Sequence, residues 1–243
     1  MNVLRLLRFC SDALFPPQCA SCKKKLSPEN RFRTICNECF SHIPIRTGCL
    51  CAICERRIPD IFGRCRCAES LTLAAASLFE CNEIQNLIRA LKYDRIREAA
   101  LPLGYLLSRY LEESALPLFS STESILLLPI PLHTKKERVR GFNQSLLIAQ
   151  AFLHTLPTHH ITIHTDILFR NKNTPSQTIQ PSHRARKENL AGAFTLQNSE
   201  QIKGCVILLL DDVSTSGATL CEALRCVKTA HPKCVIGLTI AKA

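Results

Sequence analysis

The chain has 243 residues, which allows one large domain or a medium domain with a small one. Hydrophobic residues make up 46% and can build a packed core, whereas aromatic residues make up 6% and tryptophan is absent, which argues against a nucleic-acid reader rich in base stacking. The formal charge of +11 suits an anionic partner such as a phosphate or a nucleic acid.

Cysteine is the outlier of the composition, with 15 residues. The sequence shows no secretory signal and no apolar stretch of membrane-spanning length. We therefore expect a cytoplasmic, reduced protein without membrane insertion, in which clustered cysteines bind metal. Eight thiolates on two Zn²⁺ ions would lower the formal charge to about +7. The remaining basic excess suits an anionic partner but is also compatible with an ordinary solvated surface.

The N-terminal part predicts a short amphipathic helix over residues 1–18, followed by a cysteine-rich segment to about residue 70. This segment has little helical period and cannot close a hydrophobic core by itself. Its first unit pairs Cys19-x-x-Cys22 with Cys36-x-x-Cys39, the spacing of one tetrahedral zinc site. Its second unit pairs Cys51-x-x-Cys54 with the shorter Cys65-x-Cys67, and Cys49 is an alternative ligand. Four protein ligands leave no open position, so one or two structural zinc ions are predicted.

After residue 70 the sequence alternates helical and strand patterns. The predicted helices span 83–92, 97–113, 143–154 and 218–229, and the predicted strands span 125–130, 161–163, 166–169, 205–210 and 234–240. A basic loop is expected at 132–140, and a polar loop at 170–189 is a candidate lid. The alternation predicts an α/β fold with a largely parallel sheet flanked by helices, so we expect a domain over 71–243 and a small zinc-ribbon-like module over 1–70.

A candidate phosphate loop follows the apolar strand 205–210. Asp211 and Asp212 stand at the carboxyl end of this strand, where α/β sheets bind ligands. The chain then turns and begins a helix. The hydroxyls and backbone N–H groups of this turn suit a phosphate monoester. The residues of the turn are Ser214, Thr215, Ser216, Gly217, Ala218 and Thr219. Gly217 would let the backbone approach an oxyanion.

The two carboxylates have a different task from the loop. They cannot bind phosphate, but they can accept hydrogen bonds from vicinal ribose hydroxyls and orient a complex of Mg²⁺ with phosphoribosyl pyrophosphate (PRPP). The combination of acids and loop therefore predicts recognition of a ribose 5-phosphate. The alternative is an ordinary capped helix with spare hydroxyls.

These motifs resemble the PRPP signature of type I phosphoribosyltransferases, and nearly the whole chain resembles the ComF family, in which a zinc-binding segment precedes a phosphoribosyltransferase domain. The resemblance rests on the cysteine units, Leu87-Ile88-Arg89-Ala90-Leu91-Lys92-Tyr93, Leu128-Pro129-Ile130-Pro131, Arg138-Val139-Arg140-Gly141-Phe142-Asn143-Gln144-Ser145, the segment 177–194 and the phosphate loop. It implies catalytic roles for Asp211 and Asp212, and a pyrophosphate loop whose cations are Lys135, Lys136, Arg138 and Arg140. The shortened Cys65-x-Cys67 pair departs from the family pattern.

The resemblance also implies a role in natural transformation, the handling of incoming single-stranded DNA, with PRPP as a ligand. An active phosphoribosyltransferase of nucleotide or base metabolism is an alternative, with Mg²⁺ as cofactor. A zinc-dependent adaptor that docks on an uptake or helicase protein is another. The low aromatic content favours contacts to the DNA backbone over base stacking. The acceptor of a transferred phosphoribosyl group is not visible in the sequence.

Overall fold

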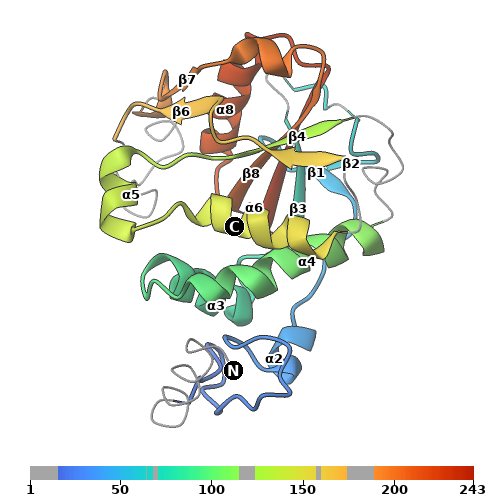
Figure 1. The fold of residues 1–243 in the computed structure, drawn as a ribbon. Coiled ribbons are helices and arrows are strands. Elements are labelled where there is room, and N and C mark those ends of the chain that lie inside the picture. Colours follow the sequence, from blue (N-terminus) through green and yellow to red (C-terminus); the bar gives the residue numbers. More distant parts are fainter. Residues whose placement is uncertain (1–15, 64, 68–70, 115–123, 157–159, 174–188) are drawn as a thin grey trace.

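The computed structural model describes residues 16–63, 65–67, 71–114, 124–156, 160–173 and 189–243, and its centre is a seven-stranded sheet (Figure 1). The strands, in the order β2-β1-β3-β9-β8-β4-β5, are β2 (Arg57–Ile58), β1 (Cys49–Cys51), β3 (Thr72–Leu78), β9 (Cys234–Lys242), β8 (Val206–Ser214), β4 (Ile125–Pro129) and β5 (Ile161–Ile163). All neighbours from β3 to β5 are parallel. The predicted α/β fold with a largely parallel sheet is confirmed.

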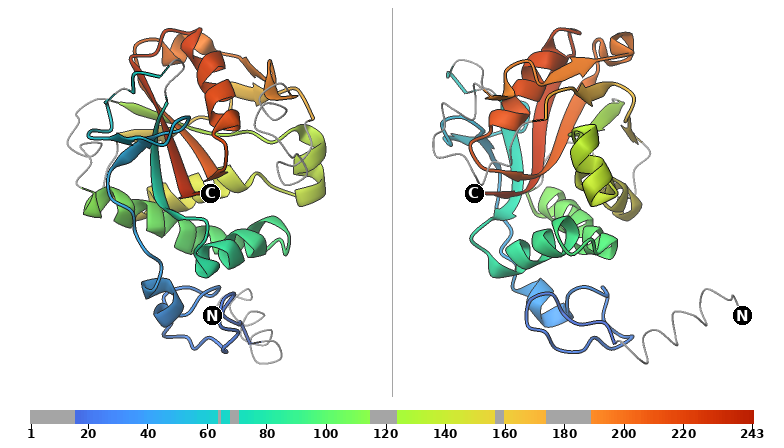
Figure 2. Two further views of the ribbon diagram at one scale, coloured as in Figure 1. Left: turned by 180° about the vertical axis from the view of Figure 1, so that it is seen from behind. Right: turned by 90° about the vertical axis from the view of Figure 1, so that its left-hand side faces the viewer.

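Helices cover both faces of the sheet, as a parallel sheet requires. The described helices are α2 (Asn37–Ser41), α3 (Asn82–Lys92), α4 (Ala100–Glu113), α5 (Thr134–Arg140), α6 (Gln144–Thr155) and α8 (Ala218–Lys228), with 3₁₀ turns η1 (Arg97–Ala99) and η3 (Ser199–Ile202). One face packs against α3, α4 and α6, and the other against α8 and the ribbon of β6 (Leu168–Arg170) with β7 (Phe194–Leu196) (Figure 2). Side chains of β8 alternate between these cores, Leu208 on one side and Leu209 on the other.

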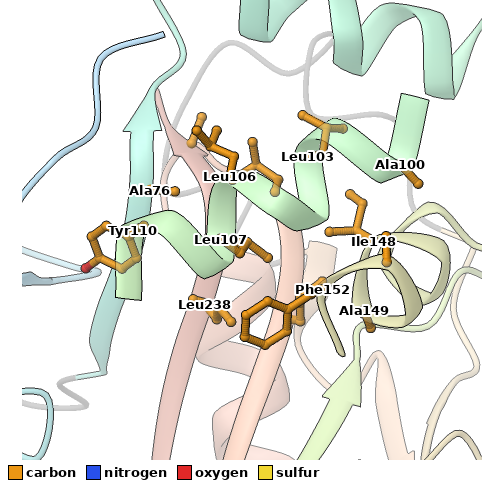
Figure 3. Close-up of a cluster of buried hydrophobic side chains, with 14 of the residues drawn as sticks. Ala76, Ala100, Leu103, Leu106, Leu107, Tyr110, Ile148, Ala149, Phe152 and Leu238 are labelled. Carbon is orange, nitrogen blue, oxygen red and sulfur yellow. The ribbon is translucent and has the colours of Figure 1, made fainter. Parts of the chain in front are cut away.

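The crossing of α4 over α6 shows how closely the first core is packed (Figure 3). Leu103, Leu107 and Phe152 are fully buried there, and each such side chain contributes about 1.5–3 kcal/mol by leaving water. Gly104 sits at the closest approach, since a Cβ on it would lie 2.5 Å from the backbone N of Phe152. The backbones of α4 and α6 are therefore in close contact at this crossing.

Several predicted boundaries were wrong for identifiable reasons. The expected basic loop 132–140 is largely helix α5, which His133 caps by accepting a hydrogen bond from Lys135 N, and which has no buried residue to produce an apolar period. Strand β3 was not predicted, because six of its seven residues are buried and it lacks alternation. Strand β8 continues to Ser214, so the turn begins later than expected. Most of the predicted N-terminal helix (residues 1–15) and of the candidate lid (residues 174–188) lies outside the described residues.

The two cysteine units lie in different parts of the molecule. The first, with α2, is placed below the sheet and helices (Figure 1) and packs through Phe32 and Phe40 onto Tyr105 of α4, at ring-centroid distances of 5.9 and 5.8 Å. The second carries the hairpin β1–β2, whose strand β1 pairs antiparallel with β3, the outermost strand of the parallel part of the sheet. The division of the chain at residue 70 stays a prediction. In the part of the chain that the structure describes, no helix has both the length and the apolar character to cross a membrane.

Candidate PRPP site and metal centres

A cavity of about 780 Å³ opens at the carboxyl ends of β8 and β4. Its floor comes from the end of β8 and the start of α8, and its walls come from α3, α5 and the loop that follows β4. The lining includes both predicted acids, Asp211 and Asp212, together with Thr215 and Thr219 from the predicted phosphate loop. The cavity is therefore placed where parallel sheets bind ligands.

The acids are held in place by the surrounding backbone and side chains. Asp211 Oδ1 accepts hydrogen bonds from the amide of Asp212 at 2.9 Å and from the hydroxyl of Ser145 at 3.2 Å. Asp212 Oδ2 lies 2.6 Å from Lys92 Nζ, an ion pair whose side chains are 5% and 20% exposed. Burial and the neighbouring charge of Asp212 raise the pKa of Asp211 to about 7, and Lys92 opposes this shift. The pair thus combines a carboxyl that titrates near neutral pH with one that has its own cation.

Three cations that influence one another also line the cavity. Lys136, Arg140 and Arg170 line the cavity, and the pKa of Lys136 is lowered by burial and by the charges of Arg170 and Arg140. Their mutual repulsion is relieved when a multiply charged anion binds between them. The other two predicted pyrophosphate-loop cations, Lys135 and Arg138, are exposed on α5 and do not line the cavity.

The run Arg140 to Ser145 links α5 to the acids. Gly141, at φ +83°, ends α5 in the left-handed conformation, and its N–H donates to the carbonyl of Glu137. The side chain of Asn143 caps α6 by accepting from Ser145 N at 3.0 Å and donates to the carbonyl of Ile130 at 3.1 Å. The run therefore presents the Ser145 hydroxyl to Asp211 and directs Arg140 into the cavity.

The predicted phosphate loop is only partly exposed to the cavity. Ser214, Ser216, Gly217 and Ala218 do not line it, and the Ser214 hydroxyl is buried. Gly217 has φ +72°, and a Cβ there would lie 2.5 Å from the carbonyl oxygen of Ala52 in the second cysteine unit. Position 217 therefore requires glycine because the loop packs directly on the Cys51-x-x-Cys54 turn, a contact that could not be predicted from the sequence.

Both predicted sets of four cysteines converge. The sulfur atoms of Cys19, Cys22, Cys36 and Cys39 lie within 4.8 Å of one another, and so do those of Cys51, Cys54, Cys65 and Cys67. A tetrahedron with metal–sulfur bonds of about 2.3 Å has edges of roughly 3.8 Å. The Cys22–Cys36 distance of 3.8 Å matches this edge, whereas the Cys51–Cys67 and Cys54–Cys65 distances of 3.3 and 3.4 Å would have to open slightly.

Cys49, the alternative ligand, is not part of the second cluster. It is 2% exposed, its sulfur lies 4.0 Å from the Tyr110 hydroxyl, and burial raises its pKa to about 11. A buried thiol of this kind is a core residue. The donor sets therefore fit two closed four-sulfur metal centres, which could supply structural support but no open coordination position.

Two residues of the cavity, Lys92 and Arg170, were not among the predicted site residues. Lys92 was quoted only as part of a motif, although Ile84, Ile88 and Lys92 recur every fourth residue, so the motif places a cation on the core-facing side of α3. Arg170 was assigned to the candidate lid, but it ends β6 and its guanidinium lies 5.5 Å from the Phe194 ring centroid. The inward direction of Lys92 could have been predicted from the helical spacing of Ile84, Ile88 and Lys92. The position of Arg170 could not, because it depends on the pairing of β6 with β7.

Comparison with known proteins finds similarity to a transferase domain and to competence proteins. Residues 143–243 match the phosphoribosyl transferase domain family. The chain is 28% identical to competence protein ComFC of Bacillus subtilis over 211 residues, 83% of this chain and 80% of that protein. It is 26% identical to competence protein F of Haemophilus influenzae, covering 82% and 93%, and 32% identical to the DNA utilization protein YhgH of Salmonella typhi, covering 56% and 57%. The family domain spans α6 to β9 and contains both acids and the phosphate loop. The chain therefore resembles the ComF competence proteins, and its residues 143–243 match a phosphoribosyl transferase domain.

Proposed function

We propose that this protein binds PRPP with Mg²⁺ in the cavity above Asp211 and Asp212 and handles single-stranded DNA in the cytoplasm during natural transformation. One observation carries the first part: two carboxylates and three cations line the same cavity at the end of a parallel sheet. A ligand with a diol at one end and a pyrophosphate at the other complements this set of acids and cations. The competence and DNA utilization proteins among the relatives support the second part.

Each group has a distinct task in the proposed complex. The acids accept hydrogen bonds from the ribose hydroxyls, Thr215 and Thr219 offer hydroxyls to the 5-phosphate at the start of α8, and Lys136, Arg140 and Arg170 face the pyrophosphate. Mg²⁺ would neutralise part of the pyrophosphate charge. Zn²⁺ at the two cysteine clusters would hold the chain around them.

A second candidate function is phosphoribosyl transfer, favoured by the three cations. In that reaction the bond from ribose C1 to pyrophosphate breaks, a bond from C1 to an acceptor nitrogen forms, and the nitrogen loses a proton to solvent. The cations would stabilise negative charge on the departing pyrophosphate, and the acids would stabilise positive charge on the ring. Release of pyrophosphate with nucleobases or single-stranded DNA as acceptors would show the activity; none with any acceptor would leave a binding protein. An adaptor that docks on an uptake or helicase protein remains the third candidate.

The test of the central proposal is calorimetric titration of PRPP with Mg²⁺ into the wild type and Asp212→Asn. We expect the variant to lose at least about tenfold in affinity, because a carboxylate that accepts hydrogen bonds from ribose hydroxyls is worth about 1.5–3 kcal/mol per charged hydrogen bond. Asp166→Asn is the control, since Asp166 lies outside the cavity lining. Equal affinity in the wild type and Asp212→Asn would overturn the assignment of the cavity.

A further inference from the structure

The mouth of the cavity carries an exposed surface that the PRPP assignment does not use. It consists of residues 93–97 after α3 and of α5, and is called the rim below. Tyr93 is 66% exposed and Val139 is 72% exposed, the two most exposed large apolar side chains among the residues described. Tyr93 also lines the cavity. An aromatic ring therefore stands in solvent directly beside the proposed ligand.

The two halves of the rim are joined into one surface. Arg95 Nη2 donates to the carbonyl of Val139 at 2.8 Å, and Arg97 Nη2 donates to the carbonyl of Gly141 at 2.9 Å. The Arg97 guanidinium also lies 5.1 Å from the ring centroid of Phe142. These contacts tie the segment after α3 to the C-terminal end of α5, which lie side by side at the same edge of the fold (Figures 1 and 2). The rim is thus held in a defined shape.

The rim is basic and its cations divide into two sets. Lys136 and Arg140 point to the cavity, whereas Lys135 and Arg138 are exposed outside it. The acidic residues of the rim are Asp94 and Glu137, so cations outnumber acids along it. The outward cations cannot be explained by a ligand inside the cavity. They lie on the helix whose Lys136 and Arg140 line the cavity together with the exposed Tyr93. Cations and an exposed aromatic ring on one surface are the combination that binds single strands through phosphates and stacked bases.

We infer that the rim is the docking surface for single-stranded nucleic acid, with a base stacked on Tyr93 and backbone phosphates held by Lys135 and Arg138. This inference rests on the proposed function and specifies its DNA-binding site. The low aromatic content favoured backbone contacts over base stacking. The inference adds stacking, because one correctly placed ring suffices for it in a chain otherwise poor in aromatic residues. A strand held there has a nucleotide at the mouth of the PRPP cavity.

The test is fluorescence anisotropy with a dye-labelled, mixed-sequence single-stranded DNA at several salt concentrations, using the full chain. Tyr93→Leu should weaken binding at least about fivefold, because stacking of one base contributes about 1–3 kcal/mol, whereas Tyr93→Phe should retain affinity. The double variant Lys135→Gln/Arg138→Gln should weaken binding and flatten the slope of log K against log salt by about 1.4, since each phosphate contact contributes about 0.7.

The matched control is Lys203→Gln/Lys228→Gln, which removes the same charge from exposed positions at the opposite, N-terminal end of β8. The inference is overturned if this pair weakens binding as much as the rim pair, if Tyr93→Leu binds like the wild type, or if duplex DNA shows the same dependence on Tyr93. Equal competition by an acidic polypeptide would also overturn it. If the wild type binds no single-stranded DNA, the DNA part of the proposed function fails with it, while the PRPP titration reports on the cavity separately.

Discussion

Asp211 is the residue whose chemistry depends most on its surroundings. Its carboxyl is placed between the negative Asp212 and the hydroxyl of Ser145, and Lys92 offsets only part of the cost of burying it. Because its pKa is raised from an ordinary 3.8 to about 7, the free protein carries a protonated Asp211 in mildly acidic solution. A protonated carboxyl has less capacity to accept hydrogen bonds from a ribose diol.

This pKa predicts a pH dependence of PRPP binding. If binding requires the ionised form, affinity should rise by up to about tenfold per pH unit as pH approaches about 7 and should level off above it. In the unliganded protein the sign is opposite: the stability that protonated Asp211 provides is full below its unfolded pKa and is lost as pH rises through about 7. Titration calorimetry across this range checks the first part. Asp211→Asn is the control that removes the carboxyl but not the titration of the PRPP phosphates, so an equally steep profile in this variant would contradict the prediction.

At the scale of elements, the decisive unit is the connection from β8 to α8. The strand carries the acids as far as Ser214, and the chain then turns through Gly217 into the helix. This turn is supported from outside by the carbonyl of Ala52, which belongs to the second cysteine unit. Lys242 of β9, paired with Ser214 in the sheet, also forms an ion pair with Glu55 at 2.8 Å. The proposed phosphate loop therefore depends on a segment more than 150 residues earlier in the chain.

Gly217→Ala tests this packing. The new Cβ would meet the Ala52 carbonyl at 2.5 Å and would also strain the positive φ. Gly204→Ala is a matched control, because Gly204 has φ +71° but open space around it. We expect the control to lose about 1 kcal/mol from backbone strain alone, and Gly217→Ala to lose clearly more and to bind PRPP more weakly. Thermal unfolding and titration measure both; equal losses in the two variants would show that Ala52 does not constrain the loop.

For the whole molecule, the two cysteine clusters have different relations to the site. The first is docked on α4 through an aromatic contact, with Arg31 3.6 Å from the ring centroid of Tyr105. The second is continuous with the central sheet and touches the phosphate loop. Loss of zinc from the two clusters should therefore have unequal effects on PRPP binding, because structural zinc stabilises mainly the segment that supplies its ligands.

Cys54→Ser and Cys22→Ser, both at exposed positions, compare the clusters. We expect Cys54→Ser to lower bound zinc, melting temperature and PRPP affinity together. Cys22→Ser should lower bound zinc but leave PRPP affinity within about twofold, because the first unit does not line the cavity. Metal analysis, thermal unfolding and titration give the three readouts. An equal loss of PRPP binding in both variants would contradict the prediction that only the second cluster supports the cavity.

The class of fold, the two groups of four cysteines and the acids at the end of β8 could be predicted from local sequence. These are local signals: a long apolar strand followed by Asp211 and Asp212, and Cys-x-x-Cys spacings that position sulfurs within a few residues. Helix α3 was visible for the same reason, since its apolar residues repeat at helical spacing. Patterns of this kind depend on neighbours along the chain.

Which residues share the cavity could not be predicted, because they come from distant parts of the chain. Lys92 meets Asp212, and Ser145 meets Asp211, across 120 and 66 residues of chain. The same packing directed Lys136 and Arg140 inward and left Lys135 and Arg138 exposed, although all four belong to one basic run. It also placed β1 and β2 in the central sheet and Ala52 against Gly217. Long-range contacts of this kind leave no periodic trace in the sequence, because they follow from how the elements cross rather than from local composition.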